Sequence, residues 1–242
     1  MLFAPLRATT LLATKLSAAA MSTSAQSCKT GPAALIFLHG LGDSPAGWSS
    51  LEYSLPSIRP RLKDIKYVFP PAPTISITIN GGATMPGWFD LYDWPIGVGA
   101  KDDREGKLAA VSQIEKEVSK LEAEGIPKSR IVVGGFSQGG AIALLAAYRS
   151  VEPYAGCGAL SAWLTLTDEL SVPEAAKVTP LFWAHGQYDD KVLFEQQAFG
   201  VEKLETQGIS ITKSDYPMGH ESHPKEIEAF ATFVDDLLFG EE

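Results

Sequence analysis

Residues 135–139 read Gly135-Phe136-Ser137-Gln138-Gly139, a G-x-S-x-G pattern from which much of the architecture can be predicted. An apolar run at residues 130–133 precedes it, and a longer apolar run over residues 138–150 follows it. The first run predicts a buried strand and the second a buried helix. A serine at such a junction is typical of a nucleophile elbow, a sharp turn that exposes the hydroxyl. Both glycines are expected to be required, because a Cβ at either position would clash across the turn.

Short apolar runs alternate with longer amphipathic ones along the rest of the chain. Strands are expected at residues 33–38, 66–69, 130–133, 156–160, 180–184 and 209–216, and helices at 44–55, 102–124, 138–150, 192–206 and 225–239. This alternation predicts a mostly parallel central sheet with helices on both faces. With the serine junction, it predicts an α/β-hydrolase fold. Residues 71–94 have no clear period and are expected to form a functional loop.

A serine hydroxyl is a weak nucleophile that needs a base, and the base needs an orienting acid. In the predicted fold these residues follow one another in the order serine, acid, histidine. His220 comes directly after the strand at 209–216 and is the expected base. His223 is the alternative, but it precedes Pro224 at the expected start of the last helix, where a solvated histidine is unremarkable.

The acid is expected in the loop that follows the strand at 180–184. Asp189 and Asp190 are adjacent in this loop, and their positions favour Asp189 only weakly. His185 precedes both carboxylates, so it cannot follow the acid in the expected order and is interpreted as structural.

The oxyanion of the tetrahedral intermediate needs at least two backbone N–H donors. Gln138, directly after the nucleophile, is expected to supply one of them. The glycine-rich residues 39–43, His-Gly-Leu-Gly-Asp, follow an early strand and are expected to supply the other from Leu41. The alternative is that residues 39–43 form only a tight strand-to-helix turn.

The composition sets limits on the class of protein. The 242 residues carry a net charge of −9, which argues against nucleic acid as a partner and allows at most transient membrane contact. No apolar run approaches the roughly 18 residues that a transmembrane helix needs. The two cysteines, Cys28 and Cys157, cannot form a disulfide framework, and Cys157 is expected to be a buried, inert thiol. These features predict a cytoplasmic location.

Residues 1–30 are interpreted separately from residues 31–242, which are expected to form the hydrolase domain. They contain no Asp or Glu but carry basic residues among many Ala, Ser, Thr and Leu residues. This composition is typical either of a leader outside the fold or of a transit peptide to the mitochondrion or plastid. Met21 is an alternative start of the chain.

Three segments together resemble the acyl-protein thioesterase / lysophospholipase family of carboxylesterases. They are residues 37–43 (FLHGLGD), 85–90 (MPGWFD) and 135–140 (GFSQGG). The likeness covers nearly the whole chain after residue 31. It implies a serine hydrolase that needs no metal or organic cofactor and acts on S-acylated proteins, lysophospholipids or small acyl esters.

The resemblance also implies roles for individual residues. The family's nucleophile, acid and base fall on Ser137, Asp189 and His220, and its oxyanion donors fall on the backbone of Leu41 and Gln138. Four further residues are implied to bind substrate, namely Met85, Trp88, Phe89 and Trp163. The alternative for Trp88 and Phe89 is that they only pack their loop against the body of the protein.

The chain departs from the family pattern at residues 190–191, Asp-Lys, where Pro or Val is usual, and at Thr165, where Pro is common. These departures put the acceptance of acidic substrates and the preferred chain length in question. Two other functions stay open: a lysophospholipase or small-molecule carboxylesterase without a protein substrate, and a non-catalytic binding protein of the same fold. The latter would be expected to have lost part of the triad or of the oxyanion loop, and this chain has lost neither.

Overall fold

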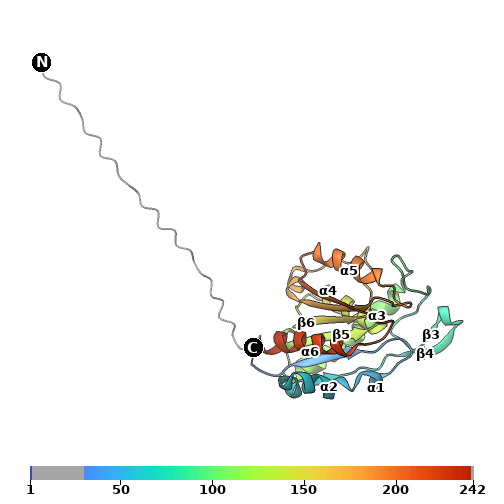
Figure 1. The fold of residues 1–242 in the computed structure, drawn as a ribbon, viewed down its shortest axis with the longest axis horizontal. Coiled ribbons are helices and arrows are strands. Elements are labelled where there is room, and N and C mark those ends of the chain that lie inside the picture. Colours follow the sequence, from blue (N-terminus) through green and yellow to red (C-terminus); the bar gives the residue numbers. More distant parts are fainter. Residues whose placement is uncertain (2–29, 241–242) are drawn as a thin grey trace.

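The computed structural model describes residue 1 and residues 30–240 (Figure 1). Within these residues a six-stranded sheet runs in the order β2-β1-β5-β6-β7-β8, and every neighbouring pair is parallel. Its strands are β1 (Ala34–Leu38), β2 (Lys66–Val68), β5 (Ile131–Phe136), β6 (Gly156–Leu160), β7 (Leu181–Gly186) and β8 (Ile211–Tyr216). The predicted mostly parallel sheet is therefore confirmed.

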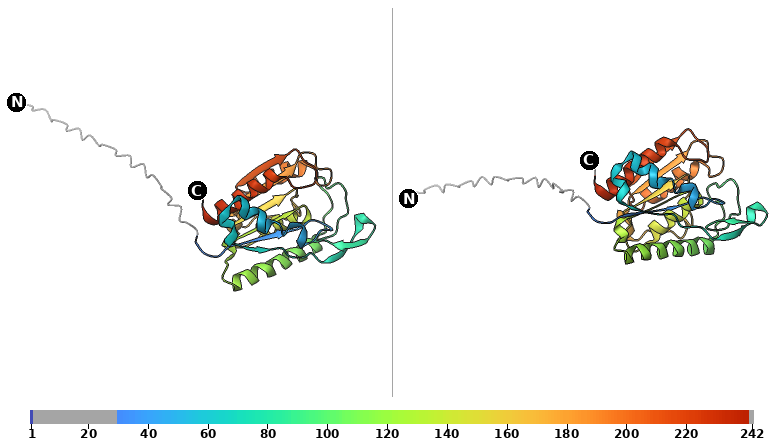
Figure 2. Two further views of the ribbon diagram at one scale, coloured as in Figure 1. Left: turned by 60° about the horizontal axis from the view of Figure 1, so that its bottom comes forward. Right: turned by 90° about the horizontal axis from the view of Figure 1, so that it is seen from below.

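Helices cover both faces of the sheet (Figure 1, Figure 2). On one face lie α1 (Pro45–Trp48), α2 (Leu51–Ile58) and α6 (Pro224–Phe239), and on the other lie α3 (Arg104–Ala123), α4 (Gln138–Arg149) and α5 (Glu195–Glu205). Short 3₁₀ helices add η1 (Pro60–Asp64), η2 (Thr78–Asn80), η3 (Lys128–Arg130) and η4 (Glu174–Val178). Alternate residues of β1 enter different cores, Leu35 and Phe37 on the α6 side and Ile36 and Leu38 on the α4 side.

The helix expected at residues 44–55 is divided into α1 and α2. The Glu52 N–H bonds to the carbonyl of Ser49, three residues back instead of four, so the regular helix is interrupted at residues 49–50. Helix α2 then continues past the predicted end to Ile58, with Pro56 inside it.

The segment at residues 71–94, expected to be a loop, contains regular structure. β3 (Thr74–Ile77) and β4 (Ala83–Pro86) pair as an antiparallel hairpin that projects from the body of the protein (Figure 1). Gly81 and Gly82, in the connection, have φ values of 66° and 79°, a conformation that glycine adopts without steric cost. Each strand has only four residues, which is too short for an alternation of apolar and polar side chains to be recognised in this proline-rich segment.

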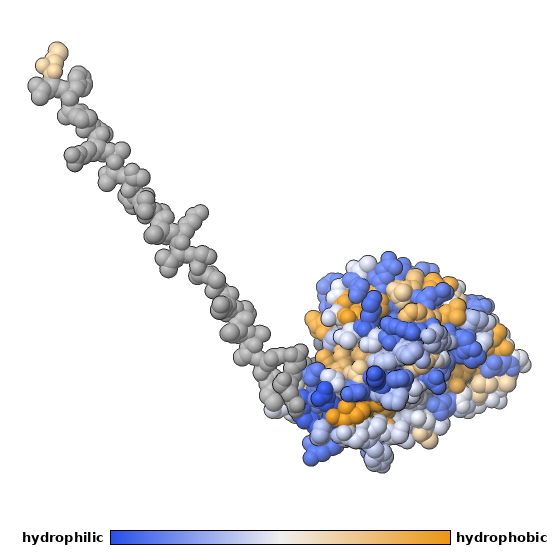
Figure 3. All heavy atoms as spheres, viewed as in Figure 1, coloured by the Kyte–Doolittle hydropathy of each residue, from blue (hydrophilic) through white to orange (hydrophobic). Residues whose placement is uncertain are grey.

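Further expectations concern the leader, the two cysteines and a membrane span. Of the predicted leader, the structure describes only residues 1 and 30, so Cys28 lies outside the described residues. Cys157 is buried in β6, and burial raises the pKa of its thiol, as expected for an inert cysteine. No helix among residues 30–240 has both the length and the apolar character needed to cross a membrane. The face shown in Figure 3 mixes hydrophilic residues with separate hydrophobic areas.

Candidate active site

Ser137 occupies the single position between β5 and α4. Its backbone has φ 53° and ψ −121°, a strained conformation for a residue with a side chain. The flanking glycines make this turn possible. A Cβ on Gly135 would lie 2.5 Å from the carbonyl carbon of Gly139, and one on Gly139 would lie 2.4 Å from the Leu38 oxygen. The predicted clash across the turn is therefore confirmed at Gly135, whereas at Gly139 the clash is with the end of the neighbouring strand β1. The hydroxyl is held at the carboxyl end of β5.

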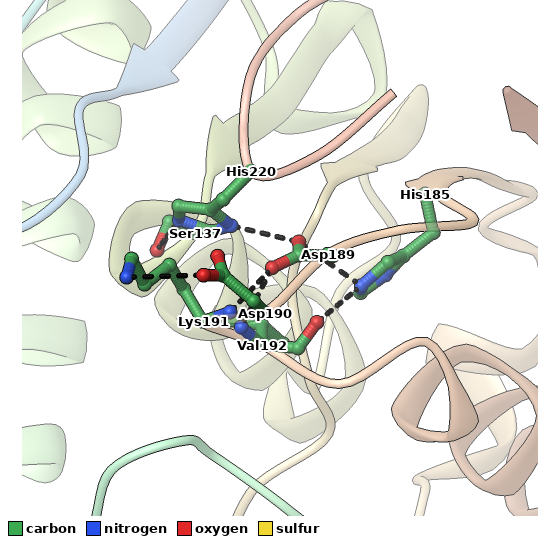
Figure 4. Close-up of polar contacts among 7 residues, drawn as sticks. All are labelled: Ser137, His185, Asp189, Asp190, Lys191, Val192 and His220. Carbon is green, nitrogen blue, oxygen red and sulfur yellow. Dashed lines mark hydrogen bonds and ion pairs between the residues drawn. The ribbon is translucent and has the colours of Figure 1, made fainter. Parts of the chain in front are cut away.

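Ser137, His220 and Asp189 form one hydrogen-bonded chain (Figure 4). His220 Nε2 lies 2.9 Å from Ser137 Oγ, and His220 Nδ1 lies 2.8 Å from Asp189 Oδ2. The three residues follow β5, β8 and β7, and they meet because parallel strands end at the same edge of the sheet. A proton on Nδ1 that is donated to Asp189 leaves Nε2 free to accept the serine hydroxyl proton.

Asp190 and His223, the two alternatives from the sequence, lie apart from this chain. The Asp190 carboxylate is 75% exposed and faces Lys191 Nζ at 3.4 Å (Figure 4). His223 is the N-cap of α6, where its Nδ1 accepts the Lys225 N–H at 3.1 Å and its own N–H donates to Glu226 Oε2. Within each pair of neighbours, the fold turns one residue toward the serine and leaves the other at the surface or at a helix end.

The Asp189 carboxylate is buried and surrounded by donors. Its Oδ1 accepts the backbone N–H groups of Lys191 and Val192, each at 2.9 Å, and its Oδ2 accepts His220 Nδ1–H. Burial by itself raises the pKa of Asp189, but the hydrogen bonds from His185, His220 and the Lys191 backbone outweigh it and hold the pKa well below its usual range. Asp189 is therefore ionised at neutral pH, which is the state that could stabilise an imidazolium on His220.

His185 contacts the loop that carries Asp189. Its side chain is buried, and its Nε2–H donates to the Val192 carbonyl at 2.8 Å while lying 3.4 Å from Asp189 Oδ2. The interpretation of His185 as structural agrees with this placement, because it does not reach Ser137.

Leu41 and Gln138 border the same cavity as the serine. Among residues 30–240, neither backbone N–H donates a hydrogen bond to a protein acceptor. The Gln138 N–H is also the first of α4, a 12-residue helix whose dipole places partial positive charge at this end. Two unengaged backbone donors beside a serine hydroxyl are an arrangement that could bind an oxyanion.

A cavity of about 490 Å³ opens beside Ser137. Its apolar lining includes Leu91, Trp94, Ile96, Trp163 and Val192. Its polar lining includes Ser137 and His220 together with the charged residues Asp43, Lys191 and Glu221. Within residues 30–240, no group of three or more His, Cys, Asp or Glu side chains is arranged to hold a metal ion.

The predicted substrate-binding residues are only partly at this cavity. Trp163 lines it, whereas Met85, Trp88 and Phe89 do not. Met85 packs at the edge of the core beside Asn80, and Trp88 and Phe89 are 2% and 0% exposed. The edge of the Phe89 ring contacts Trp163, 5.8 Å between centroids, so Phe89 stands behind the cavity wall. The alternative, in which Trp88 and Phe89 hold their loop against the body, agrees with these positions.

Most of the apolar lining was not predicted from the sequence. Trp94 and Ile96 lie in a segment without regular structure, which is joined to the acid loop because the Ile96 N–H bonds to Lys191 O and the Leu193 N–H bonds to Ile96 O. Trp94 and Ile96, in a stretch with two glycines and a proline (residues 91–100, LYDWPIGVGA), were the available signal. No spacing rule connects them with Val192, almost 100 residues later in the chain.

Comparisons with known proteins agree with this geometry. A sequence profile of the phospholipase/carboxylesterase family matches residues 22–238. Acyl-protein thioesterase 1 of Mycosarcoma maydis is 38% identical over 222 residues, which cover 85% of this chain and 91% of that protein. The crystal structure of Arabidopsis thaliana SOBER1 matches with a TM-score of 0.80 at 30% identity, covering 86% of this chain and 100% of that chain. The crystal structure of Zea mays acyl-protein thioesterase 2 matches with a TM-score of 0.75 at 31% identity, and the match covers 86% of this chain and 95% of that chain. Since the family match includes the serine junction and spans most of the sequence, the chain belongs to the phospholipase/carboxylesterase family of α/β-hydrolases.

Proposed function

We propose that this protein hydrolyses acyl thioesters and esters, with Ser137 as nucleophile, His220 as base and Asp189 as orienting acid. The observation that carries the proposal is the hydrogen-bonded chain of these three residues at an apolar-walled cavity. His220 accepts the serine proton as Oγ attacks the acyl carbonyl, and it then protonates the leaving thiol or alcohol. Water hydrolyses the acyl-serine by the reverse path, so the cycle requires no cofactor.

The backbone N–H groups of Leu41 and Gln138 are the proposed oxyanion donors. Both border the cavity next to Ser137, and one carries the positive end of the α4 dipole. The negative charge develops on the carbonyl oxygen only during attack, so these donors stabilise the transition state more than the bound substrate.

S-acylated proteins are the proposed substrates, with the acyl chain against the apolar wall and a cysteine thiol as the leaving group. Burying an acyl chain stabilises the complex by about 0.8 kcal/mol per CH₂. Relatives named acyl-protein thioesterase support this choice. A lysophospholipase or carboxylesterase acting on small esters is the second candidate, which relatives named carboxylesterase support.

Two measurements test the proposal. A fluorophosphonate probe is expected to label the folded protein at Ser137 and to fail with Ser137→Ala, which should also abolish hydrolysis. Unchanged hydrolysis by Ser137→Ala would refute the mechanism. Rates with a palmitoyl peptide, a lysophospholipid and short acyl esters, measured side by side, then separate the two candidate functions by their kcat/KM values.

The organisation of the chain and its location complete the proposal. Residues 31–242 are the catalytic domain and residues 1–30 a leader, so the enzyme acts in the cytoplasm unless the leader directs it to the mitochondrion or plastid. Fluorescent fusions of the full chain and of residues 31–242 test this, because only a transit peptide would make their locations differ.

A further inference from the structure

Trp88 connects the two chain segments that carry the proposed oxyanion donors. Its indole Nε1–H donates to the His39 carbonyl at 2.8 Å, two residues before Leu41, and its backbone N–H donates to Gln138 Oε1 at 2.8 Å. Gln138 Nε2 in turn donates to the Phe89 carbonyl at 2.6 Å. One residue of the 85–90 segment thus bonds both to the loop after β1 and to the residue after the nucleophile.

The same segment contacts the loop at residues 39–43 at two further points. The Gly42 N–H donates to the Pro86 carbonyl at 2.8 Å. A Cβ on Gly87 would lie 2.9 Å from Leu41 Cδ1, so the Gly87 backbone packs closely against the Leu41 side chain. These contacts place the Pro86–Trp88 turn directly against the residue whose N–H is the proposed donor.

The loop at residues 39–43 needs such a connection. It contains Gly40 and Gly42, the latter at φ 76°, and glycine backbones are free to adopt many conformations unless contacts hold them. Trp88 is 2% exposed and Gln138 0% exposed, so their hydrogen bonds are shielded from competing water and strongly directional.

We propose that Trp88 is a positioning residue that fixes the spacing between the Leu41 and Gln138 N–H groups, and that it serves the oxyanion instead of the acyl chain. The inference rests on the proposed function. Oxyanion donors act only when they lie about 2.7–3.1 Å from the developing charge. A displacement of about 1 Å can lower the rate on the order of a hundredfold, and because the charge exists only in the transition state, the loss falls on kcat and not on KM.

Trp88→Phe and Gln138→Met each break the connection while leaving every backbone N–H in place. Both variants are expected to lower kcat for a long-chain acyl ester by about 10- to 100-fold, with KM within about threefold of the original value. An acyl trifluoromethyl ketone, which forms an oxyanion adduct with Ser137, should bind more weakly by the same factor as kcat/KM falls. A thioether analogue of the substrate, which forms no adduct, should bind with unchanged Kd.

Trp183→Phe is the matched control. Trp183 is also a fully buried tryptophan, but within residues 30–240 its indole nitrogen has no hydrogen-bond partner. This variant removes the same atoms from the core without breaking a bond to the oxyanion loop. It is expected to lower the melting temperature no more than Trp88→Phe, because it breaks no hydrogen bond, while leaving kcat within about twofold.

Several outcomes would overturn the inference. One is an unchanged kcat in folded Trp88→Phe. Another is a loss of affinity for the thioether analogue equal to the loss of kcat/KM, which would show that Trp88 binds the acyl chain. If the losses of kcat in Trp88→Phe and Gln138→Met multiplied in the variant that carries both substitutions, the two residues would act independently, which would also contradict a shared connection. If Trp88→Phe does not fold, Gln138→Met decides by the same criteria. Failure of the wild-type protein to react with a fluorophosphonate would instead refute the proposed function itself.

Discussion

Asp189→Asn is expected to lower kcat by about 10³- to 10⁴-fold while leaving the fold intact. The reason lies in the three hydrogen-bond donors around the carboxylate. Oδ1 accepts two backbone N–H groups at 2.9 Å, and Oδ2 accepts the proton on His220 Nδ1 at 2.8 Å. Asparagine has nearly the same shape but only one acceptor oxygen, so it cannot accept both from the two backbone N–H groups and from His220 Nδ1.

The structure determines which side the amide oxygen will take. If its NH₂ group faced the backbone of Lys191 and Val192, two buried donors would be left unsatisfied, at about 1–3 kcal/mol each. The amide oxygen is therefore expected to keep these two bonds, and the NH₂ group then faces His220. To accept from it, His220 must carry its proton on Nε2, where it blocks deprotonation of Ser137.

The assay is hydrolysis of a p-nitrophenyl acyl ester at neutral pH, together with the rate of fluorophosphonate labelling and the melting temperature. Asp190→Asn is the matched control, since that carboxylate is exposed beside Lys191, and its kcat should change less than about twofold. A folded Asp189→Asn that keeps more than about a tenth of the original kcat would refute the reasoning, as would a larger loss in Asp190→Asn.

Three further predictions concern the turn, the cavity wall and a buried acid. Gly135→Ala should lower both the melting temperature and labelling of the nucleophile, because its Cβ would lie 2.5 Å from backbone of Gly139; a thermal melt with normal stability would contradict this. Trp94→Ala should raise KM for a long-chain ester about 4- to 15-fold, the contribution of one or two CH₂ groups, and leave KM for an acetyl ester unchanged. Equal effects on both esters would show that Trp94 does not contact the chain. Glu226 is buried, and burial raises its pKa to about 7, partly opposed by the hydrogen bond from the His223 backbone. The folded state therefore holds its proton where the unfolded state has lost it, and the free energy of unfolding should fall as pH rises from about 4.5 to 7. Glu226→Gln cannot ionise, so at pH 8 its free energy of unfolding should exceed that of the wild type by up to about 3 kcal/mol, as measured by urea unfolding. Below pH 4.5 the variant should have no such advantage.

The parts of the structure that could be predicted depend on local signals. Apolar runs identify the strands, and the two glycines around Ser137 identify the turn, since only a short stretch of chain determines each. Chain order and strand ends also indicate His220. Asp189 and Asp190 differ in neither type nor neighbourhood, and what separates them is a turn that directs one carboxylate at two backbone N–H groups.

Trp88 shows why the remainder could not be predicted. Its apolar side chain and its place in a segment near the motifs are compatible with a cavity wall. Whether the indole faces an acyl chain or the His39 carbonyl depends on the path of the β3–β4 hairpin that precedes it. That hairpin consists of four-residue strands whose pairing involves no periodic pattern long enough to recognise.

The position of β8 has a consequence for how the enzyme is made. It is the last strand in the chain and an outer one, and His220 follows it directly. Ser137 leaves the ribosome 83 residues before that histidine. In the proposed mechanism Ser137 therefore has no base until β8 has paired with β7, because only then can His220 lie 2.9 Å from the serine oxygen.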